Sequence, residues 1–303
     1  MEKLIIEVRG NEYADRQLNQ NVPWSSSEIA KDSAECREAG AAIYHYHARN
    51  ADGSPSLEND EYADSARGIR KNSDILIHPT LGFVAHAGTE EDRLSHIVAL
   101  SKSDDTFPDF APIDLGSTNV DLFDTKLGSY QTKDRVYTNS TATLEYFAKR
   151  IPELGVRPYF VSWNIGFSRL FGDFLNFGII AETAFVAFCM TEDFMHCGHP
   201  GTVKGLMAHL DFLPSGRKIE WSAYVEGSNL FRLASTIIAE GGHISIGLGD
   251  YPYLELGTPT NAELVTQIAH FARLCGREVA TPQEARGILG LPSQNHVLLG
   301  TTN

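Results

Sequence analysis

Short runs of β-branched and aromatic residues alternate with longer segments of helical periodicity along this chain, and the alternation repeats eight times. Such alternation predicts parallel strands joined by crossover helices. Eight units without a break in composition favour a closed (β/α)8 TIM barrel over an open doubly wound sheet. No GxGxxG or P-loop signature follows the first strand, which argues against a Rossmann-type sheet. We therefore expect a single barrel domain over residues 1–303, with a C-terminal extension from about 276 to 303.

The predicted strands, in chain order, are Leu4–Val8, Ala41–His47, Ile75–Pro79, Ala111–Gly116, Arg157–Ser162, Thr183–Cys189, Ile219–Tyr224 and His243–Gly247. The predicted helices are Ser27–Glu38, Glu58–Lys71, Glu90–Ser101, Thr141–Arg150, Leu170–Phe177, Val203–Leu210, Asn229–Glu240 and Asn261–Leu274. The longest irregular stretch, Thr118–Ser140, follows the fourth strand. Loops after barrel strands build the catalytic face, so we expect this stretch there.

Charge and cysteine content narrow the class of protein. The formal net charge is −14, and the absence of any Lys/Arg run argues against nucleic acid or an anionic membrane as a partner. The four cysteines are scattered without a CxxC pair, which is typical of reduced thiols in the cytoplasm. No signal peptide opens the chain, and its apolar stretches are too short to span a bilayer. These features predict a soluble cytoplasmic protein.

Two histidines mark the end of the second predicted strand, which reads Ile43-Tyr44-His45-Tyr46-His47. Side chains two residues apart on a strand share one face, so both imidazoles are expected to point the same way. The carboxyl ends of barrel strands carry the chemistry of such enzymes. Two imidazoles suit Zn²⁺ or another borderline divalent metal, although an HxH pair alone also occurs in structural and surface roles.

Several ordered motifs resemble the β-keto acid cleavage enzymes, also called the 3-keto-5-aminohexanoate cleavage family. They are the residues 41–49 with Asp52-Gly53-Ser54-Pro55-Ser56, the segment Gln20–Trp24, the run Leu115–Asn119, the pair of segments Gly241–His243 and Gly247–Asp250, and the ending Ala280–Arg286. The resemblance extends over most of the chain.

The resemblance implies a barrel that holds a divalent metal, usually zinc, with His45, His47 and a glutamate of strand eight. It implies transfer of an acyl group from a small β-keto acid to the CoA of acetyl-CoA, with release of acetoacetate. The metal would polarise the keto acid carbonyl and bind its carboxylate. An arginine and an aspartate of strand eight, the latter matching Asp250, would assist the deprotonation. Members of the family are commonly homotetramers.

Strand eight departs from the family pattern in this chain. Gly249 stands at the position of the metal-binding glutamate, and Ser245 stands at the position of the arginine. A loop arginine expected after strand seven is Ser228. Asp250 remains. The sequence is therefore that of a divergent member, and the family activity does not transfer to it directly.

Strand one offers a compensation. Its residues Leu4, Ile6 and Val8 fit the apolar outer face of the barrel, which turns Glu7 and Arg9 toward the lumen. We hypothesise that Glu7 completes the metal site and that Arg9 replaces the missing arginine. The alternatives are a Glu7–Arg9 pair that forms a structural polar layer, and ligation by His78 of strand three.

Three further residues match substrate positions of the family. Thr80 matches a hydroxyl residue for the substrate carboxylate, Ser117 matches a hydroxyl near the substrate, and Glu12 matches an acid that meets an amino group in some members. Ser117 could instead cap a loop, and Glu12 could be an exposed acid without a role. The run from Cys189 to His199 is a weaker candidate for a second zinc site, because its spacing fits no standard motif.

Three functions remain open on the sequence. The first is metal-dependent acyl transfer with acetyl-CoA as described. The second is a CoA-independent, aldolase-like lyase, which the loss of two arginines makes plausible. The third is a barrel that binds a carboxylate ligand without catalysis, and retention of His45, His47 and Asp250 argues against it.

Overall fold

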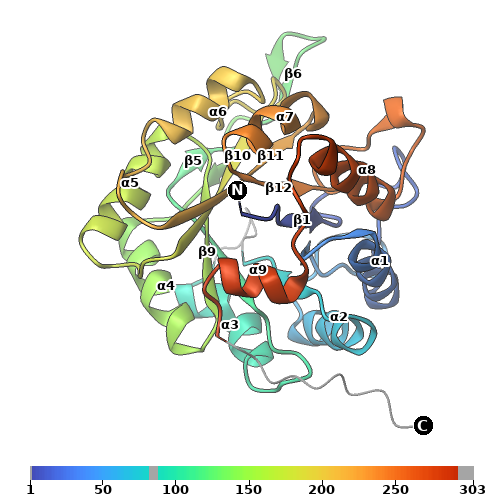
Figure 1. Cartoon of the computed structure of the whole chain (residues 1–303), viewed down its shortest axis with the longest axis horizontal. Helices are drawn as coiled ribbons and strands as arrows, with labels where there is room; N and C mark the ends of the chain where they lie inside the picture. The colour runs from blue at the N-terminus through green and yellow to red at the C-terminus, as the bar shows by residue number, and fades with distance from the viewer. Residues whose placement is uncertain (1, 82–87, 293–303) are drawn as a thin grey trace.

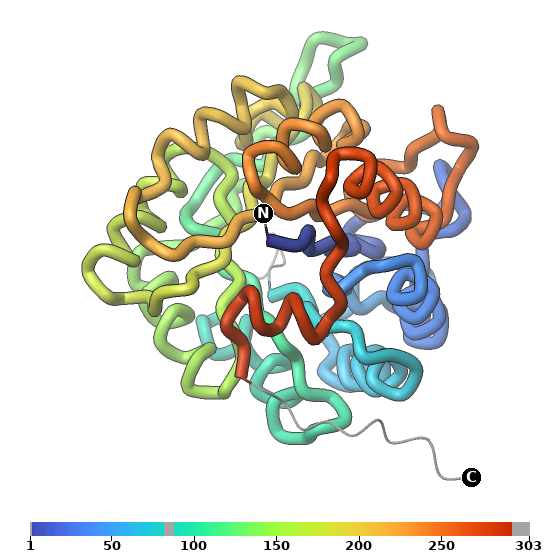
Figure 2. The backbone as a smooth tube through the Cα atoms, viewed as in Figure 1, coloured from blue at the N-terminus to red at the C-terminus, as the bar shows by residue number. Residues whose placement is uncertain are grey.

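A computed structural model describes residues 2–81 and 88–292. Its eight-stranded parallel sheet has the order β3-β2-β1-β12-β11-β10-β9-β4, and the helices surround it (Figures 1 and 2). The sheet strands are β1 (Ile6–Arg9), β2 (Ile43–Tyr46), β3 (Leu76–Pro79), β4 (Phe110–Asp114), β9 (Arg157–Ser162), β10 (Ala184–Thr191), β11 (Ile219–Glu226) and β12 (His243–Ile246). The prediction of a (β/α)8 TIM barrel is confirmed.

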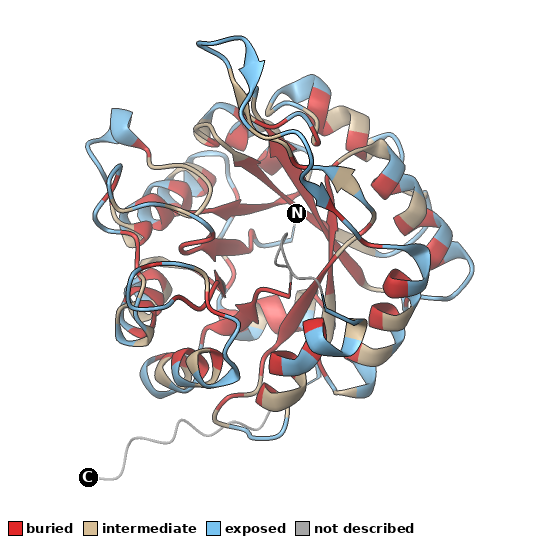
Figure 3. Cartoon of the chain, turned by 180° about the vertical axis from the view of Figure 1, so that it is seen from behind, coloured by how far each residue is buried: buried red, intermediate tan, exposed pale blue. Residues whose placement is uncertain are grey.

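The helices alternate with the strands as predicted. They are α1 (Ser26–Ala39), α2 (Asn59–Asn72), α3 (Glu90–Leu100), α4 (Thr141–Glu153), α5 (Ile165–Asn176), α6 (Val203–Leu210), α7 (Phe231–Ala239), α8 (Asn261–Leu274) and α9 (Pro282–Ile288). Helix α5 begins five residues earlier than predicted because the side chain of Asn164 caps it, accepting hydrogen bonds from the backbone of Gly166 and Phe167 at 2.9 and 3.3 Å. In Figure 3 the strands form the buried interior, and exposure is concentrated on the outer helices and the loops.

Asp109 joins the two ends of the sheet, β3 and β4. Its backbone N–H donates to the carbonyl of Ile77, and its carboxylate accepts from the N–H of Ile77 at 2.8 Å. The same carboxylate pairs with Arg70 of α2 and Arg286 of α9. Burial raises the pKa of Asp109, but the two guanidinium groups outweigh this and lower it. One buried, ionised carboxylate therefore ties both sheet ends and two helices together.

Replacing Asp109 by asparagine is expected to lower the free energy of unfolding by about 3 to 5 kcal/mol, because two partly buried arginines lose their counter-charge. Urea unfolding of both proteins measures the difference. Asp74→Asn is the matched control, since its exposed pair with Arg37 is expected to contribute less than about 1 kcal/mol. Equal losses in the two variants would contradict this assignment.

The stretch after β4 is not irregular throughout. It forms two short antiparallel pairs, β5 (Thr118–Asn119) with β8 (Val136–Tyr137), and β6 (Phe123–Asp124) with β7 (Ser129–Tyr130). The β6–β7 hairpin projects beyond the ring of helices (Figures 1 and 3). Val120, Leu122, Arg135 and Tyr137 of this stretch line a cavity at the carboxyl ends of the barrel strands, as expected for the catalytic face.

The opposite end of the barrel is covered by the C-terminal region. The backbone of Leu4 pairs with Glu278 and Ala280 at 2.7 and 2.8 Å, and α9 crosses this end near the N-terminus (Figure 1). Residues 293–303 of the predicted C-terminal extension lie outside the described residues. No helix in the described part of the chain has both the length and the apolar character needed to cross a membrane.

Candidate metal centre and active site

His45 and His47 lie at the carboxyl end of β2, where their buried side chains line a cavity of about 690 Å³. Their ring centroids are 5.3 Å apart, so the predicted shared orientation of the two imidazoles is present. The side-chain amide of Asn11 accepts from the N–H of His47 at 2.8 Å and donates to its carbonyl at 2.9 Å. This double hydrogen bond fixes the backbone of His47 beyond the end of the strand.

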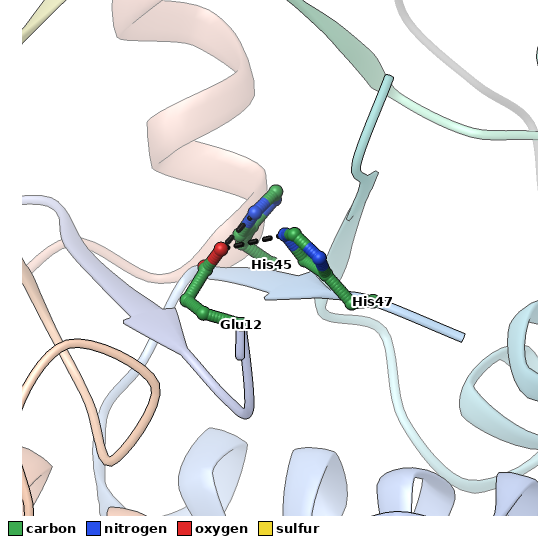
Figure 4. Close-up of side chains that lie close together, drawn as sticks. All are labelled: Glu12, His45 and His47. Carbon is green, nitrogen blue, oxygen red and sulfur yellow. Dashed lines mark ion pairs between the residues drawn. The ribbon is translucent and has the colours of Figure 1, made fainter. Parts of the chain in front are cut away.

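Glu12, in the loop after β1, is the third member of the group (Figure 4). Its Oε1 lies 3.0 Å from Nε2 of His45, and its Oε2 lies 2.6 Å from Nε2 of His47. Potential ligand atoms of these three buried residues all lie within 4.8 Å of one another. In the described part of the chain, no other set of three or more histidine, cysteine or acidic side chains lies this close together. Two imidazoles and a carboxylate facing a cavity match the ligand set of catalytic zinc sites, which keep one position open.

The hydrogen bond on the far side of His45 supports a cation at this point. Nδ1 of His45 lies 2.9 Å from the carbonyl oxygen of His78, which can only accept, so Nδ1 carries the proton. Burial lowers the pKa of His45 to about 4, so the ring is neutral and its Nε2 presents a lone pair. That lone pair faces Oε1 of Glu12, which receives no well-aligned hydrogen bond. A metal ion held by His45 and Glu12 would relieve the repulsion between these two lone pairs.

The structure brings Glu12, not Glu7, to the two histidines. Glu7 does face the lumen, but the strand register pairs it with Ile43 and pairs Arg9 with His45. Glu7 therefore lies two residues below the level of His45, a drop of roughly 6 to 7 Å along the strand. Its carboxylate contacts Nδ1 of His78 at 2.7 Å, a contact that also turns His78 away from ligation through that nitrogen.

Glu7 forms a polar layer beneath the candidate metal centre. Besides His78, its carboxylate accepts hydrogen bonds from the hydroxyls of Tyr159 and Ser245. Burial raises the pKa of Glu7, but the hydrogen bond and charge of His78, with His45 and Arg9 nearby, lower it to about 2. The predicted alternative of a structural polar layer is thus present, with His78 as the partner in place of Arg9.

Glu7→Gln is expected to lower the free energy of unfolding by about 3 kcal/mol at pH 7, since a pKa depressed from 4.5 to about 2 stabilises the folded state to that extent. The folded-state pKa is depressed, so this stabilisation is complete above pH 4.5 and is lost as the pH falls toward 2. The difference in free energy of unfolding between wild type and Glu7→Gln, measured with urea, should therefore become smaller as the pH falls from 4.5 toward 2. A gap that is independent of pH would contradict the assignment.

Arg9 and Asp250, the two predicted catalytic residues, are in contact. Nε of Arg9 lies 2.7 Å from Oδ1 of Asp250, and Nη2 lies 3.1 Å from Oε1 of Glu12. The guanidinium also stacks over the ring of Tyr224, 3.8 Å from its centroid. Burial lowers the pKa of Arg9, but the charges of Asp250 and Glu12 raise it well above its ordinary value. Burial, with Glu12 and Glu226 nearby, raises the pKa of Asp250.

Three acidic side chains lie around this arginine in the cavity. Glu12, Glu226 and Asp250 surround a single guanidinium, and all three carboxylates line the cavity. Burial raises the pKa of Glu226 to about 7, with Arg9 opposing and Glu12 and Asp114 reinforcing the change. A divalent cation held by Glu12 would favour the ionised forms of these neighbouring carboxyl groups.

Comparison with known proteins decides the family. The model of the β-keto acid cleavage enzymes matches residues 3–291, nearly the whole chain. The chain belongs to the β-keto acid cleavage enzyme family. It is 29% identical over 296 residues to a 3-keto-5-aminohexanoate cleavage enzyme of Fusobacterium nucleatum, covering 96% of this chain and 99% of the relative. It is 28% identical to a 3-oxoadipate:acetyl-CoA acetyltransferase of Cupriavidus necator, covering 91% of this chain and 90% of the relative.

Other matches extend the range of relatives and structures. A 3-dehydrocarnitine:acetyl-CoA trimethylamine transferase of Rhizobium meliloti is 26% identical, with 90% of this chain and 91% of the relative covered. The apo structure of ObcA superimposes with a TM-score of 0.68 at 14% identity. That match covers 89% of this chain and 66% of the other, and it supports the barrel fold alone.

The predicted substrate residues of this β-keto acid cleavage enzyme occupy different surroundings. Thr80 is buried and lines the cavity, at the end of β3. Within the described part of the chain, Ser117 does not line this cavity. Its hydroxyl accepts a hydrogen bond from the N–H of Asn139 at 2.8 Å, which matches the loop-capping alternative. Glu12 is buried, so the alternative of an exposed acid is not observed.

Two residues of the site were given no role by the sequence reasoning. Asp114 of β4 lines the cavity with its carboxylate held by Nε1 of Trp163 at 2.6 Å and by the hydroxyl of Tyr137 at 2.8 Å. Arg49, at the end of the residues 41–49 motif, donates to backbone carbonyls of the loop that carries Glu12. The position of Arg49 directly after His47 and Ala48 was the available signal, but its contacts depend on how the first loop folds back.

The run from Cys189 to His199 does not gather as a metal site in the described part of the chain. Cys189 lies within β10, and Cys197 is buried in the following loop. Nε2 of His199 accepts a hydrogen bond from the backbone of Ile165 at 3.3 Å. His199 thus joins the loop after β10 to the start of α5.

Proposed function

We propose that this enzyme transfers the acyl group of a small β-keto acid to CoA in a metal-dependent reaction with acetyl-CoA. In the net reaction the keto acid and acetyl-CoA are converted into a new acyl-CoA and acetoacetate. The observation that carries the proposal is the juxtaposition of the Glu12–His45–His47 group with the Arg9–Asp250 pair in one cavity. Full-length relatives whose names specify acetyl-CoA as a substrate support the same reaction.

Glu12, His45 and His47 would hold the metal, which we propose to be Zn²⁺ on the basis of its two imidazoles and one carboxylate. When bound, such an ion polarises a carbonyl group and stabilises negative charge that develops on its oxygen. His78 contributes by holding the ring of His45 through its backbone carbonyl. This contact fixes which nitrogen of His45 faces the cavity.

Asp250 is proposed to accept the proton that leaves the carbon between the keto and carboxylate groups. Its raised pKa, caused first by burial, makes its carboxylate a stronger base than an exposed aspartate. Arg9 holds Asp250 in place at 2.7 Å and supplies positive charge beside the reacting carbons. Thr80 lies on the same cavity wall, where its hydroxyl is proposed to bind the substrate carboxylate.

Apolar walls surround these polar groups. Leu18, Val22, Val161, Met195 and Leu248 line the cavity and limit the access of water to it. Exclusion of water strengthens the electrostatic interactions of Arg9 and Asp250 and protects a thioester from hydrolysis. Ser117 remains a proposed substrate contact only if the loop that holds it to Asn139 moves.

The test is an assay of the zinc-loaded protein with acetyl-CoA and a panel of β-keto acids that includes 3-oxoadipate and 3-keto-5-aminohexanoate. Acetoacetate and a new acyl-CoA, formed in equal amounts, are expected from at least one of them. Cleavage of a keto acid without acetyl-CoA would favour the lyase alternative. No turnover of any compound, with tight binding of one, would favour the non-catalytic barrel.

We also propose that the enzyme works as a cytoplasmic homotetramer. The four cysteines are free, which is consistent with a reducing compartment. The tetramer rests on the family resemblance, and light scattering of the purified protein measures it.

A further inference from the structure

Gly249 lies directly against the side chain of Glu12. A Cβ atom added at Gly249 would be 2.5 Å from Cγ of Glu12 and 2.9 Å from its backbone nitrogen. Real Cβ atoms do not approach other atoms this closely, so any side chain at this position would displace Glu12. The backbone of Gly249 is outside the positive-φ set of the described glycines, so space and not conformation accounts for the glycine.

Arg49 holds the same loop from the other side. This buried guanidinium donates to the backbone carbonyls of Asn11 and Glu12 and, at 2.7 Å, to the carbonyl of Gly53. Glu12 itself has a φ of 31°, a conformation that residues other than glycine rarely adopt. Such a conformation persists only where the surroundings enforce it, and it is common at functional sites.

We propose that Glu12 is the third metal ligand and that Gly249 and Arg49 are positioning residues that hold it there. Gly249 provides the space in which the side chain of Glu12 lies, and Arg49 keeps the loop in the turn that directs the carboxylate to His45 and His47. The proposal rests on the metal-dependent function proposed above and assigns the parts of this chain that create its metal site.

The arrangement has a physical advantage for binding. A ligand on a loop without such restraints loses conformational freedom when the metal binds, which weakens affinity. Here Arg49 holds the backbone of the loop, and the absence of a side chain at Gly249 leaves room for the side chain of Glu12. The oxygen atoms of Glu12 consequently lie 3.0 and 2.6 Å from the two imidazole nitrogens.

The first experiment measures the dissociation constant of zinc by competition with a chromogenic chelator, together with the rise in melting temperature on addition of zinc. Glu12→Gln is expected to weaken zinc binding by at least about 100-fold, because loss of even an outer partner of a metal site costs 10- to 100-fold. Glu226→Gln is the matched control. It removes a carboxyl group from the same cavity and is expected to weaken binding by no more than about tenfold.

The second experiment tests the positioning residues in a double-mutant cycle. Gly249→Ala and Arg49→Met are each expected to weaken zinc binding by about tenfold or more while Glu12 is present, in line with the loss of supporting contacts at metal sites. In the Glu12→Gln background neither change should weaken it further, since the ligand they position is gone. Circular dichroism and melting temperature establish that each variant is folded.

The outcomes separate this proposal from the proposed function. Wild-type zinc affinity in Glu12→Gln, beside tight binding by the parent protein, would overturn the ligand assignment and leave the metal-dependent function standing. Effects of Gly249→Ala and Arg49→Met that persist in the Glu12→Gln background would overturn their positioning role. Failure of the parent protein to bind zinc, manganese or cobalt would overturn both proposals together.

Discussion

His47→Ala is expected to reduce kcat/KM by about 1,000-fold or more and to lower the zinc content of the purified protein below one-tenth of the wild-type value. His47 lies 2.6 Å from Glu12 and supplies one of three candidate ligands. Loss of the several kcal/mol that a metal contributes to carbonyl polarisation corresponds to a factor of this size. The fold should survive, because Asn11 holds the backbone of His47 and not its ring.

A chelator provides the complementary measurement. Wild-type protein stripped of metal should lose activity to the same extent and regain it when zinc is restored, whereas His47→Ala should not regain it at the same zinc concentration. The matched control is His270→Ala, an exposed position on α8. Wild-type zinc content in His47→Ala, measured by elemental analysis, would count against the whole metal centre.

The histidine pair could be predicted because strand periodicity determines which face a side chain occupies. In a barrel one face is the lumen, so two histidines at positions i and i+2 at a strand end meet in the active site. The barrel itself followed from the eightfold alternation of strands and helices. Both predictions depend on local patterns, which a single sequence displays directly.

The third member of the group could not be predicted in the same way. Alternation shows that Glu7 faces the lumen, but it does not show at which level along the barrel axis. That level depends on the register between β1 and β2, which pairs Arg9 with His45. Glu12 reaches the histidines because the loop after β1 turns back over the strand ends, and this path is set by long-range contacts of Arg49 and Gly249.

The surroundings of Ser245 and Gly249, which stand at charged positions of the family pattern, depend on how β1 and β12 pack together. Strands β1 and β12 are neighbours, and the register pairs Glu7 with Ser245. Arg9 occupies the level above, and its guanidinium reaches Asp250 from β1. This contact agrees with the hypothesis that Arg9 replaces the missing arginine, and the catalytic role of Arg9 stays a proposal.

Replacing Arg9 by methionine is expected to lower the free energy of unfolding of the metal-free protein by about 3 to 5 kcal/mol at pH 8. The substitution retains much of the apolar stem but leaves the buried carboxylates of Asp250 and Glu12 without their shared counter-charge. Arg217→Met is the control, because its exposed pair with Glu182 is expected to contribute less than about 1 kcal/mol.

The pH dependence of this loss distinguishes charge from packing. Without Arg9 the pKa of Asp250, which burial already raises, should rise further, and the pKa of Glu12 should rise because only His45 and His47 then oppose the effect of burial. A raised folded-state pKa gives stability that is present at low pH and is lost as the pH rises through it. The loss of unfolding free energy caused by Arg9→Met, measured with urea, should therefore be smaller at pH 5 than at pH 8. A deficit of the same size at both values would instead indicate that the stacking of Arg9 on Tyr224 is what the substitution removes.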